Sequence, residues 1–379
     1  MKILLVGEYS RLHSSLKEGL VALGHQVTIV SSGDGMKKFK TDINFNSKIK
    51  ASFVLNKLNN LCIRFLNTDF IKIENAYRFK KIIPQLKDFD VVQLINEDAL
   101  FIEPKTQIKL LQQLIITNKK LCVLCCGDDF TSVSYYLNKN LKYSILTPYL
   151  NNKALKNRFQ FSLKYVTKPY KRLHEFVKKN SFGTIATDMD YHLPMQAQPQ
   201  YLGFIPNPIN TNKIDFTELK IDSKINIFLG INTRSKIKKG ITFFEEALAT
   251  IKDMYPEKVE IQITENLPYT QYIQVYNKAH ILLDQVYAYD QGYNALEAMA
   301  KGKVVFTGAE QEWLEHYSLE KDTVAINALP DVDYLVQKLE WLILNPDKII
   351  EISKNARQFI EIEHDYVTSA KKYIKAWSH

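Results

Sequence analysis

The sequence has few cysteines and no long apolar run, and both shortages narrow what the protein can be. Its 379 residues include four cysteines, too few for the disulfide framework that holds small secreted domains together. No stretch reaches the roughly 18 uninterrupted apolar residues that a transmembrane helix needs. The opening MKILLVGEYS has a short apolar run but no cleavage site of the signal-peptide type. We therefore expect a cytoplasmic protein.

Three of the four cysteines lie in one short run, LCVLCCG, which holds Cys122, Cys125 and Cys126. A structural zinc site normally draws on two ligand pairs separated by a loop, and Cys62 supplies no second pair. The run has the composition of a buried strand, so we interpret its cysteines as free thiols in a reducing compartment. The sequence therefore predicts no metal site.

Positive charge is concentrated in the first half of the chain. Residues 1–205 hold 30 Lys and Arg against 16 Asp and Glu, an excess of 14 positive charges. Residues 206–379 hold 20 basic residues against 25 acidic ones, an excess of five negative charges. The densest basic stretch, 153–179, is either a solvated surface or a contact for nucleic acid, an anionic membrane or an acidic substrate. No helix-turn-helix, RNP-like or zinc-finger pattern accompanies it, so we expect no nucleic-acid partner.

Short apolar runs alternate with helical patterns along the chain, as is typical of parallel α/β sheets. The strands expected in the first half are 2–6, 26–30, 91–95, 121–125 and 184–186, with a helix from residue 12 to residue 23. Near residue 205, the prolines and asparagines of YLGFIPNPINTNKI indicate a linker. The strands expected in the second half are 225–229, 259–264, 281–283 and 304–307, with helices at 242–251, 269–279 and 295–300. Residues 346–377 are expected to be mostly helical.

Two doubly wound sheets joined by a linker predict a cleft between them. Ligands of open α/β sheets bind at the carboxyl ends of the strands, where helix N-termini present unpaired N–H groups. We therefore expect a small ligand, one that carries phosphate, in this cleft.

The most informative run is AHILLDQVYAYDQGYNALEAMAKGKVVFTG, at 279–308. It predicts a strand that ends at Asp284, a loop that holds Gly292, and a helix that carries Glu297 in its first two turns. An ionised carboxylate there can accept hydrogen bonds from the two hydroxyls of a ribose. A surface glutamate favoured by the helix dipole is the alternative interpretation.

Part of this run, LEAMAKGKVV, closely resembles the LEAMAxGKPVI signature of the retaining family 4 glycosyltransferases, which have the GT-B fold. Four further segments resemble that family in the same order along the chain, namely LGHQVTIV at 23–30, IPNPIN at 205–210, GINTRSKIKKG at 230–240 and NARQFIEIEHDYVTSAKKYI at 355–374. The resemblance thus extends along most of the chain, and the agreement in order and spacing supports it.

The resemblance implies a GT-B fold, with two Rossmann-like α/β domains that face a cleft. Residues 1–205 would form the acceptor-side domain, residues 206–355 the domain that binds the nucleotide-sugar donor, and residues 356–379 a helix that packs back on the first domain. The implied activity is that of a metal-independent hexosyltransferase without a cofactor. It would move a sugar from a UDP- or GDP-linked donor to a glycan or lipid-linked acceptor in cell-surface polysaccharide biosynthesis, with retention.

The resemblance also assigns roles to single residues. Arg234 and Lys239 match the pair that binds the donor diphosphate, where fixed cations stabilise the charge of the leaving group. Glu297 matches the glutamate that binds the ribose. Gly7 matches the glycine whose loop approaches the donor phosphates, although a turn glycine after the first strand is the simpler interpretation. Gly292 matches the loop glycine.

Two departures from the family pattern affect the sugar site. Tyr289 stands where the family has a glutamate that contacts the transferred sugar, and Asp290 or Asp284 would have to replace its carboxylate. The segment CCGDDFTS has no histidine where the family often has one. There, Asp128 would bind sugar hydroxyls or else cap a helix, and His13 would face the cleft from the first helix.

Three further expectations follow from the resemblance. The pair of aspartates in Asp188-Met189-Asp190 is similar to a metal-binding motif of a different glycosyltransferase fold, but we interpret it as a loop. Because of Tyr289 and the absent histidine, a non-catalytic homologue that binds a carbohydrate or an assembly partner is the alternative function, and a sugar-nucleotide epimerase is a third. The basic stretch 153–179 is expected to hold the first domain peripherally against an anionic membrane.

Overall fold

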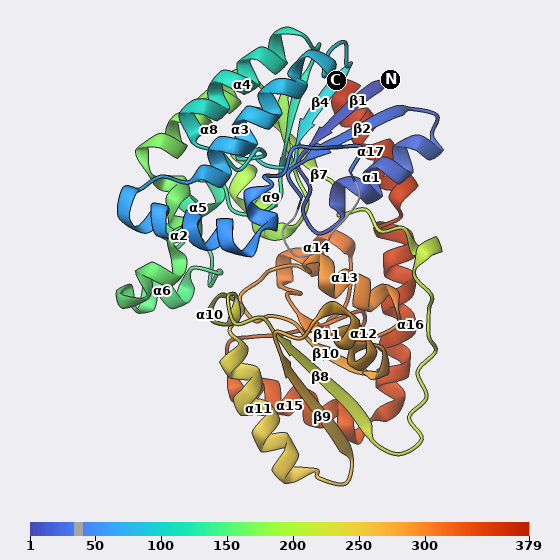
Figure 1. The fold of residues 1–379 in the computed structure, drawn as a ribbon. Helices are drawn as coiled ribbons and strands as arrows, with labels where there is room; N and C mark the ends of the chain where they lie inside the picture. Colours follow the sequence, from blue (N-terminus) through green and yellow to red (C-terminus); the bar gives the residue numbers. More distant parts are fainter. Residues whose placement is uncertain (34–40, 379) are drawn as a thin grey trace.

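The computed structural model describes residues 1–33 and 41–378, which form two α/β halves, each built on a parallel sheet (Figure 1). The first sheet has seven strands in the order β3-β2-β1-β4-β5-β6-β7. The second has five strands in the order β12-β11-β10-β8-β9. This arrangement confirms the prediction of two doubly wound parallel sheets.

The strands predicted from apolar runs are all present. The first sheet consists of β1 (Lys2–Val6), β2 (Gln26–Ser31), β3 (Ile43–Asn44), β4 (Val91–Leu94), β5 (Leu121–Cys125), β6 (Gly183–Ala186) and β7 (Tyr201–Phe204). The second consists of β8 (Ile225–Ile231), β9 (Val259–Glu265), β10 (Ile281–Leu283), β11 (Val304–Thr307) and β12 (Ile326–Asn327). Strands β3, β7 and β12 were not predicted. Each is a short strand at the edge of its sheet, where a continuous apolar run is not required.

Helices cover both faces of each sheet (Figure 1). Those that follow strands of the first sheet are α1 (Leu12–Ala22), α2 (Phe53–Leu66), α3 (Phe70–Ile82), α4 (Pro104–Ile116), α5 (Phe130–Leu137), α6 (Thr147–Asn151), α7 (Gln160–Leu163), α8 (Lys168–Asn180) and α9 (Met189–Met195). The later ones are α10 (Lys236–Lys239), α11 (Ile241–Met254), α12 (Tyr269–Lys278), α13 (Tyr293–Ala300), α14 (Gln311–Tyr317), α15 (Val332–Leu344), α16 (Pro346–Glu363) and α17 (Tyr366–Ser378). Over the described ranges, none of them is long and apolar enough to cross a bilayer.

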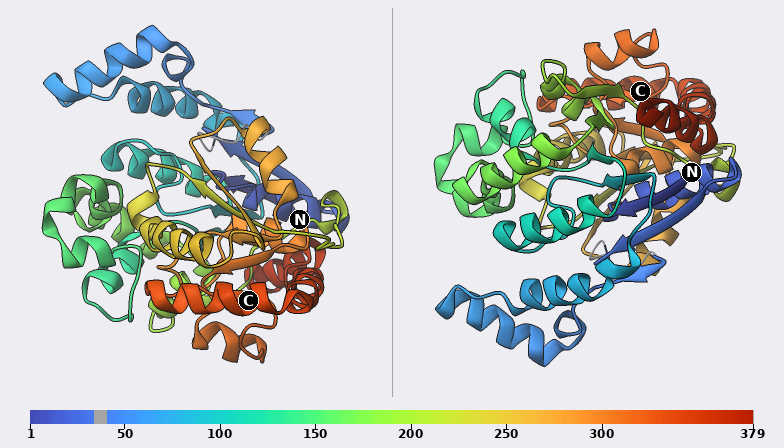
Figure 2. Two further views of the ribbon diagram at one scale, coloured as in Figure 1. Left: turned by 90° about the horizontal axis from the view of Figure 1, so that it is seen from below. Right: turned by 90° about the horizontal axis from the view of Figure 1, so that it is seen from above.

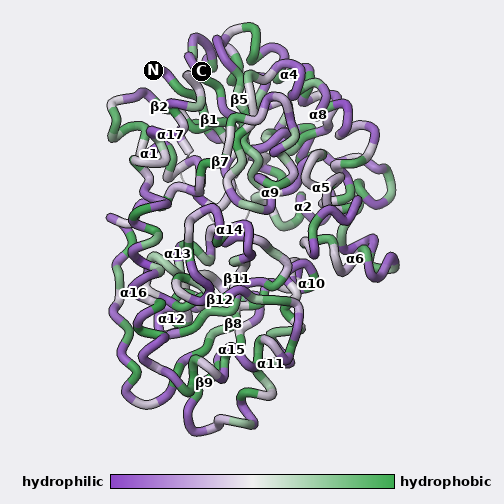
Figure 3. Tube along the Cα trace, turned by 180° about the vertical axis from the view of Figure 1, so that it is seen from behind, coloured by the Kyte–Doolittle hydropathy of each residue, from purple (hydrophilic) through white to green (hydrophobic). Residues whose placement is uncertain are grey.

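The central strands form the hydrophobic core of each half. Strands β4 and β5 in the first sheet, and β10 and β11 in the second, are buried along their whole length. Figure 3 shows hydrophobic residues in these central strands and hydrophilic residues more often in the helices outside them. Because helices cover both faces, the central strands read as continuous apolar runs, which explains why the sequence predicted them well.

The chain crosses between the two halves along two adjacent segments. The backbone N–H of Ile209 donates to the carbonyl of His364 at 2.7 Å, and Ile209 forms a parallel bridge with Asp365. Helix α16 packs on α13 of the second half, whereas α17 packs on α1 of the first half (Figure 1). The contact with α1 is close, since a Cβ at Gly19 would lie 2.1 Å from the carbonyl oxygen of Tyr366. The last helix is thus part of the first half.

Candidate functional site

A cavity of about 300 Å³ lies between the two halves, at the carboxyl ends of strands in the first sheet. Loops that follow β1, β5 and β6 form one wall, and the start of α13 forms the other. The lining residues are Tyr9, Ser10, Leu12, Cys126, Gly127, Asp128, Phe161, Tyr165, Thr187, Asp188, Tyr191, Asn207, Gly292 and Tyr293. Two residues of the predicted site, Asp128 and Gly292, therefore face the same cavity from opposite halves. Its position is the one expected for ligands of open parallel sheets.

Gly7 closes the first strand in a conformation that suits glycine. Its φ is +89°, and a Cβ on it would lie 2.2 Å from Cγ2 of Ile95. Its N–H donates to the carbonyl of Val30 at 2.8 Å. The residue is therefore required for the turn and for the close approach of the β4 loop, which is the simpler of its two interpretations.

His13 is fully buried beneath this turn instead of facing the cavity. Its Nδ1 lies 2.8 Å from the carbonyl oxygen of Gly7, and its Nε2 lies 3.3 Å from Nε2 of Gln93. These partners assign the proton to Nδ1, because the carbonyl needs a donor and the Gln93 amide nitrogen needs an acceptor. The Gln93 Oε1 in turn accepts from the indole N–H of Trp377 at 3.0 Å. Burial lowers the pKa of His13 to about 4, so the neutral imidazole serves to link α17 to the β1 turn.

Asp128 lies at the wall of the cavity and contacts the opposite half. The hydroxyl of Ser162 donates to its Oδ2, and the ammonium of Lys238 lies 3.7 Å from the same oxygen. Lys238 also donates to Ser162 Oγ at 2.6 Å. The helix cap predicted as an alternative for Asp128 is instead Asp129, whose side chain accepts from the N–H of Ser132 at the start of α5. The carboxylate of Asp128 thus remains at the cavity.

Lys239 pairs with Asp284 within the second half. Its Nζ lies 2.7 Å from Oδ1 of Asp284, whose side chain is 3% exposed. The backbone fixes the same contact, because the carbonyl of Lys239 accepts from the N–H of Val286 at 3.0 Å. Gly240 makes this approach possible, with φ at +64° and a hypothetical Cβ only 2.3 Å from Cγ2 of Val286. The structure therefore brings together two of the predicted site residues, Lys239 and Asp284.

Arg234 lies apart from this pair. Its side chain is exposed, and its backbone N–H donates to Oδ1 of Asn232 at 3.0 Å. The ion pairs found among residues 1–33 and 41–378 do not include it. The segment that follows it forms the short helix α10, which Gly240 caps at its C-terminus. That helix directs Lys238 toward Asp128 and Lys239 toward Asp284.

The start of α13 is tied to the first half. Gly292 immediately precedes the helix, and the hydroxyl of Tyr293 makes hydrogen bonds to Ser15 Oγ at 2.7 Å and to the carbonyl of Pro208 at 3.2 Å. Glu297 follows one turn later on the same helix and is partly buried. The N-terminal end of α13, where backbone N–H groups are unpaired, therefore points toward the cavity.

Asp290 and Asp190 hold the two halves together through backbone N–H groups. The Oδ2 of Asp290 accepts from the N–H of Met189 at 3.1 Å, and the Oδ2 of Asp190 accepts from the N–H of Tyr289 at 3.0 Å. Burial raises the pKa of both aspartates to about 7 and also raises that of Asp188. The interpretation of 188–190 as a loop was wrong, because Asp188 caps α9 and the next two residues begin that helix.

Tyr289 does not reach the cavity. Its side chain is 1% exposed, and its hydroxyl accepts from the backbone N–H of Lys142 at 2.9 Å, across the boundary between the halves. The position that holds a glutamate in the family thus makes a structural contact here.

As for metals, residues 1–33 and 41–378 include no group of three or more His, Cys, Asp or Glu that could hold an ion. The described thiols are all free.

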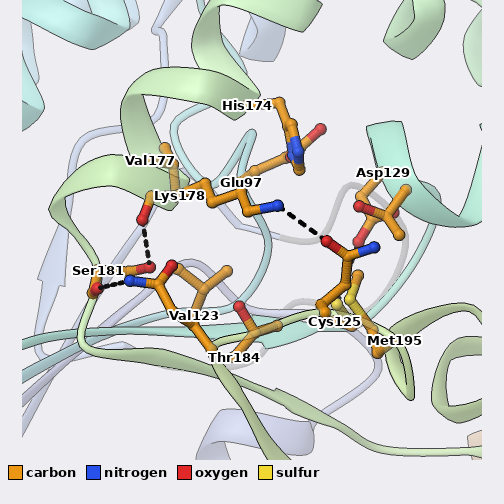
Figure 4. Close-up of a pocket in the computed structure, with 13 residues that line it drawn as sticks. Glu97, Val123, Cys125, Asp129, His174, Val177, Lys178, Ser181, Thr184 and Met195 are labelled. Atoms are coloured by element: carbon orange, nitrogen blue, oxygen red, sulfur yellow. Dashed lines mark hydrogen bonds and ion pairs between the residues drawn. The ribbon is translucent and has the colours of Figure 1, made fainter.

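A second, smaller cavity lies within the first half, between β5, β6 and α8 (Figure 4). Its volume is about 30 Å³, which is room for a water molecule but not for a sugar. Nδ1 of His174 lies 2.8 Å from Oε2 of Glu97 beside it, and the thiol of Cys125 donates to Oδ2 of Asp129 at 3.1 Å. Two further lining residues are joined by a hydrogen bond, in which Nζ of Lys178 donates to Oε1 of Gln198 at 2.8 Å. Burial raises the pKa of Glu97 to about 7.

Two residues that contact Asp128 beside the cavity between the halves, Lys238 and Ser162, were not predicted. They lie 76 residues apart in the sequence. Lys238 is one of three lysines between residues 236 and 239, a pattern that also suits a solvated surface, and Ser162 belongs to no motif. The sequence signal for Lys238 was its position directly before the predicted site residue Lys239.

Comparisons with known proteins agree with this architecture. Residues 240–375 match the family model described as Glycosyl transferase-like. No curated protein matches the sequence significantly. Among solved structures, a sucrose-phosphate synthase from Thermosynechococcus elongatus superposes with a TM-score of 0.61 at 14% identity, covering 100% of this chain and 98% of that one.

Two further solved structures bind nucleotide sugars. Anabaena HepE, in complex with UDP-glucose, has a TM-score of 0.59 at 12% identity, with 100% of this chain and 99% of that chain covered. A UDP-GlcNAc 2-epimerase from Neisseria meningitidis, bound to UDP-GlcNAc, has a TM-score of 0.53 at 12% identity, with 99% of each chain covered. At such identities the similarity establishes the fold, and the chain has the GT-B fold over its whole length.

Proposed function

We propose that this protein is a glycosyltransferase that moves a sugar from a UDP- or GDP-linked donor to a hydroxyl of a glycan or lipid-linked acceptor. The observation that carries the proposal is the cavity between the two sheets, which Asp128 and the start of α13 face from opposite halves. The match of residues 240–375 to a glycosyl transferase-like family supports the class of reaction. We further propose the division into residues 1–205 on the acceptor side, 206–355 on the donor side, and 356–379 as the returning helix.

The donor diphosphate would bind between α10 and the start of α13. The unpaired N–H groups of α13 favour an anion, and Lys239 supplies a fixed positive charge. Asp284 keeps that ammonium in position, while Arg234, being exposed, is free to close on the phosphates. Glu297 would accept hydrogen bonds from the ribose hydroxyls. As the glycosidic bond breaks, these cations and dipoles would stabilise the charge that develops on the leaving nucleoside diphosphate.

The sugar would lie against Asp128, on the wall formed by the first half. Asp128 is the carboxylate among the predicted residues that lines the cavity, and its contacts with Ser162 and Lys238 both involve Oδ2. Asp290 accepts from two backbone N–H groups, and Asp284 pairs with Lys239. Transfer would proceed with retention and without a metal ion or other cofactor, as the resemblance implies. Positioning and leaving-group stabilisation would supply most of the catalysis.

The binding of nucleotide tests this assignment. Titration calorimetry should detect UDP or GDP, and Lys239→Ala and Glu297→Ala should each weaken the affinity by about tenfold or more, since a charge-assisted contact is lost in each. Lys348→Ala is the matched control, because that lysine pairs with Glu351 on the surface of α16. If both site variants bind as tightly as the wild type, the site assignment is wrong.

A non-catalytic homologue is the second candidate, and the burial of Tyr289 favours it. The tyrosine hydroxyl accepts a hydrogen bond from the backbone N–H of Lys142, so this position contributes nothing to a sugar site. A protein of this kind would bind nucleotide or carbohydrate without releasing free nucleoside diphosphate from any donor. Incubation of UDP- and GDP-sugars with and without glycan acceptors would separate the candidates, and a donor isomerised without acceptor would indicate an epimerase.

The acceptor side would operate at the cytoplasmic face of a membrane, in the synthesis of a cell-surface polysaccharide. The basic stretch 153–179 supports this part of the proposal, since most of its lysines and arginines are exposed on the first half. The exception is Lys164, which is paired with the buried Asp98 at 2.8 Å. The exposed cations would contribute an electrostatic attraction to anionic lipid.

A further inference from the structure

Helix α2 has the reverse of the usual pattern for a helix of a globular protein, because its apolar side chains face outward. Within this fully described helix, Asn59 is the one buried residue. Its amide donates to Oδ1 of Asp69 at 3.2 Å, and its Oδ1 accepts from the N–H of Phe70 at 2.7 Å. The helix is thus attached to α3 through a polar contact.

The outward face of α2 is densely apolar. Its exposed large hydrophobic residues are Phe53, Val54, Leu55, Leu58, Leu61, Ile63, Phe65 and Leu66. Four of them, at positions 54, 58, 61 and 65, follow the spacing of one helical stripe. Phe53 is 83% exposed and Phe65 is 73% exposed. Because contiguous exposed apolar surface is uncommon in monomeric proteins, this face needs a partner.

Position and charge narrow the choice of partner. The α2–α3 hairpin extends away from the rest of the molecule in both views of Figure 2. Residues 43–68 hold four basic residues, Lys48, Lys50, Lys57 and Arg64, and no acidic residue. A second copy pairing the same faces would bring these cations together, which opposes self-association.

An anionic bilayer surface would accommodate both the exposed apolar face of α2 and the basic residues beside it. A helix with an apolar face and flanking cations lies in the plane of the membrane, with its apolar side chains in the acyl boundary and its lysines near the headgroups. Helix α2 has 14 residues, about 21 Å at 1.5 Å per residue, which suits this orientation and is too short to span. In Figure 1 the hairpin and α8 lie on the same side of the first half, and in Figure 2 the hairpin projects beyond the other helices.

We propose that α2 is an interfacial anchor that inserts its outward apolar face into a bilayer containing anionic lipid. The anchor is a separate surface from the basic stretch 153–179, which would add attraction without insertion. It does not depend on the proposed transferase activity, because none of its side chains lines the main cavity.

Flotation with lipid vesicles tests the anchor on the full-length protein. The protein should float with vesicles of phosphatidylcholine containing about one third phosphatidylglycerol at low salt, and much less with pure phosphatidylcholine. Leu58→Gln combined with Phe65→Gln should lower the partition coefficient at least tenfold. Lys57→Gln combined with Arg64→Gln should lower it by about fivefold per charge.

Matched variants distinguish insertion of α2 from non-specific adsorption of the protein through other exposed apolar residues. Leu344→Gln combined with Ile362→Gln removes two exposed apolar side chains elsewhere and should leave flotation unchanged. All these sites are exposed, so the melting temperature should stay within about a degree of the wild type. In Leu58→Trp, tryptophan fluorescence should shift to the blue with the anionic vesicles, which reports insertion in a folded protein.

Three results would overturn the proposal. The first is no flotation of the wild type with anionic vesicles at low salt. The second is flotation that Lys171→Gln combined with Arg172→Gln abolishes while the α2 variants retain it, which would assign binding to 153–179 alone. The third is a concentration-dependent dimer that Leu58→Gln combined with Phe65→Gln dissolves, which would make the apolar face a self-interface. Nucleotide titration of the same samples tests the cleft separately. A variant that loses flotation but still binds nucleotide therefore reports on α2 and not on the proposed transferase function.

Discussion

Several carboxyl groups lie in places where ionisation is unfavourable. Glu97 beside the small cavity and Asp290 between the halves are each about 4% exposed, and burial raises the pKa of both to about 7. Each accepts a backbone N–H, which lowers the pKa but does not offset the loss of water. These groups therefore bind protons more tightly in the folded protein than in the unfolded chain.

We expect Glu97→Gln to be increasingly stabilising as the pH rises. The unfolded carboxyl has its ordinary pKa of 4.5, so stability from protonated Glu97 is present in full below that pH and is lost as the pH rises through about 7. Glutamine keeps the acceptor for Phe130 and carries no charge. Urea unfolding should show the variant gaining about 2–3 kcal/mol on the wild type between about pH 5 and pH 8.

The exposed Glu257→Gln is the control for that measurement, since its side chain is 91% exposed. Its difference from the wild type should stay the same at both pH values. If the Glu97→Gln difference is also constant with pH, Glu97 titrates normally and the inference about its burial is wrong.

Among the structural elements, α10 has the closest connection to the proposed chemistry. It is four residues long, and Gly240 ends it by turning the chain against the loop after β10. Lys238 and Lys239 are aimed in different directions by this single turn. The helix therefore makes the position of both cations depend on one glycine.

We predict that Gly240→Ala destabilises the protein more than Gly24→Ala does. Both glycines have positive φ, but a Cβ at Gly240 meets Val286 at 2.3 Å, whereas Gly24 has nothing within 4 Å. Gly24→Ala should cost about 1 kcal/mol from backbone strain, and Gly240→Ala about 2–4 kcal/mol from strain and overlap together. Differential scanning calorimetry of the two variants measures this. Equal melting temperatures would mean that the α10 turn adapts freely.

The elements best predicted from sequence are those whose surroundings are apolar on all sides. Strands β5, β10 and β11 are continuous apolar runs because helices cover both faces. The family resemblance identified Asp128 and Gly292 in the loops that follow such strands. Helix α2 could not be placed, since its apolar periodicity would indicate a helix packed inward. The contact of Lys238 with Asp128 also could not be predicted, because the packing of the two halves creates it.

At the scale of the whole molecule, the two halves are joined by more than the linker near residue 205. The chain crosses back at Asp365, α17 completes the first half, and a buried hydrogen-bonded chain links Trp377, Gln93, His13 and Gly7. Contacts from Tyr289, Asp290 and Tyr293 meet the first half around the cavity. The excess of positive charge belongs to the half that carries the proposed membrane anchor, and the excess of negative charge to the half proposed to bind the nucleotide.

The most direct test of the central claim is hydrogen exchange of the full-length protein with and without saturating UDP or GDP. A nucleotide sugar bound between the sheets should slow exchange in the loops at 126–128 and 187–188, in α10 and at the start of α13, because ligand contacts suppress local opening. The rest of the chain should change little. Protection confined to other segments, or no change with either nucleotide, would contradict the account of the cleft as a nucleotide-sugar site.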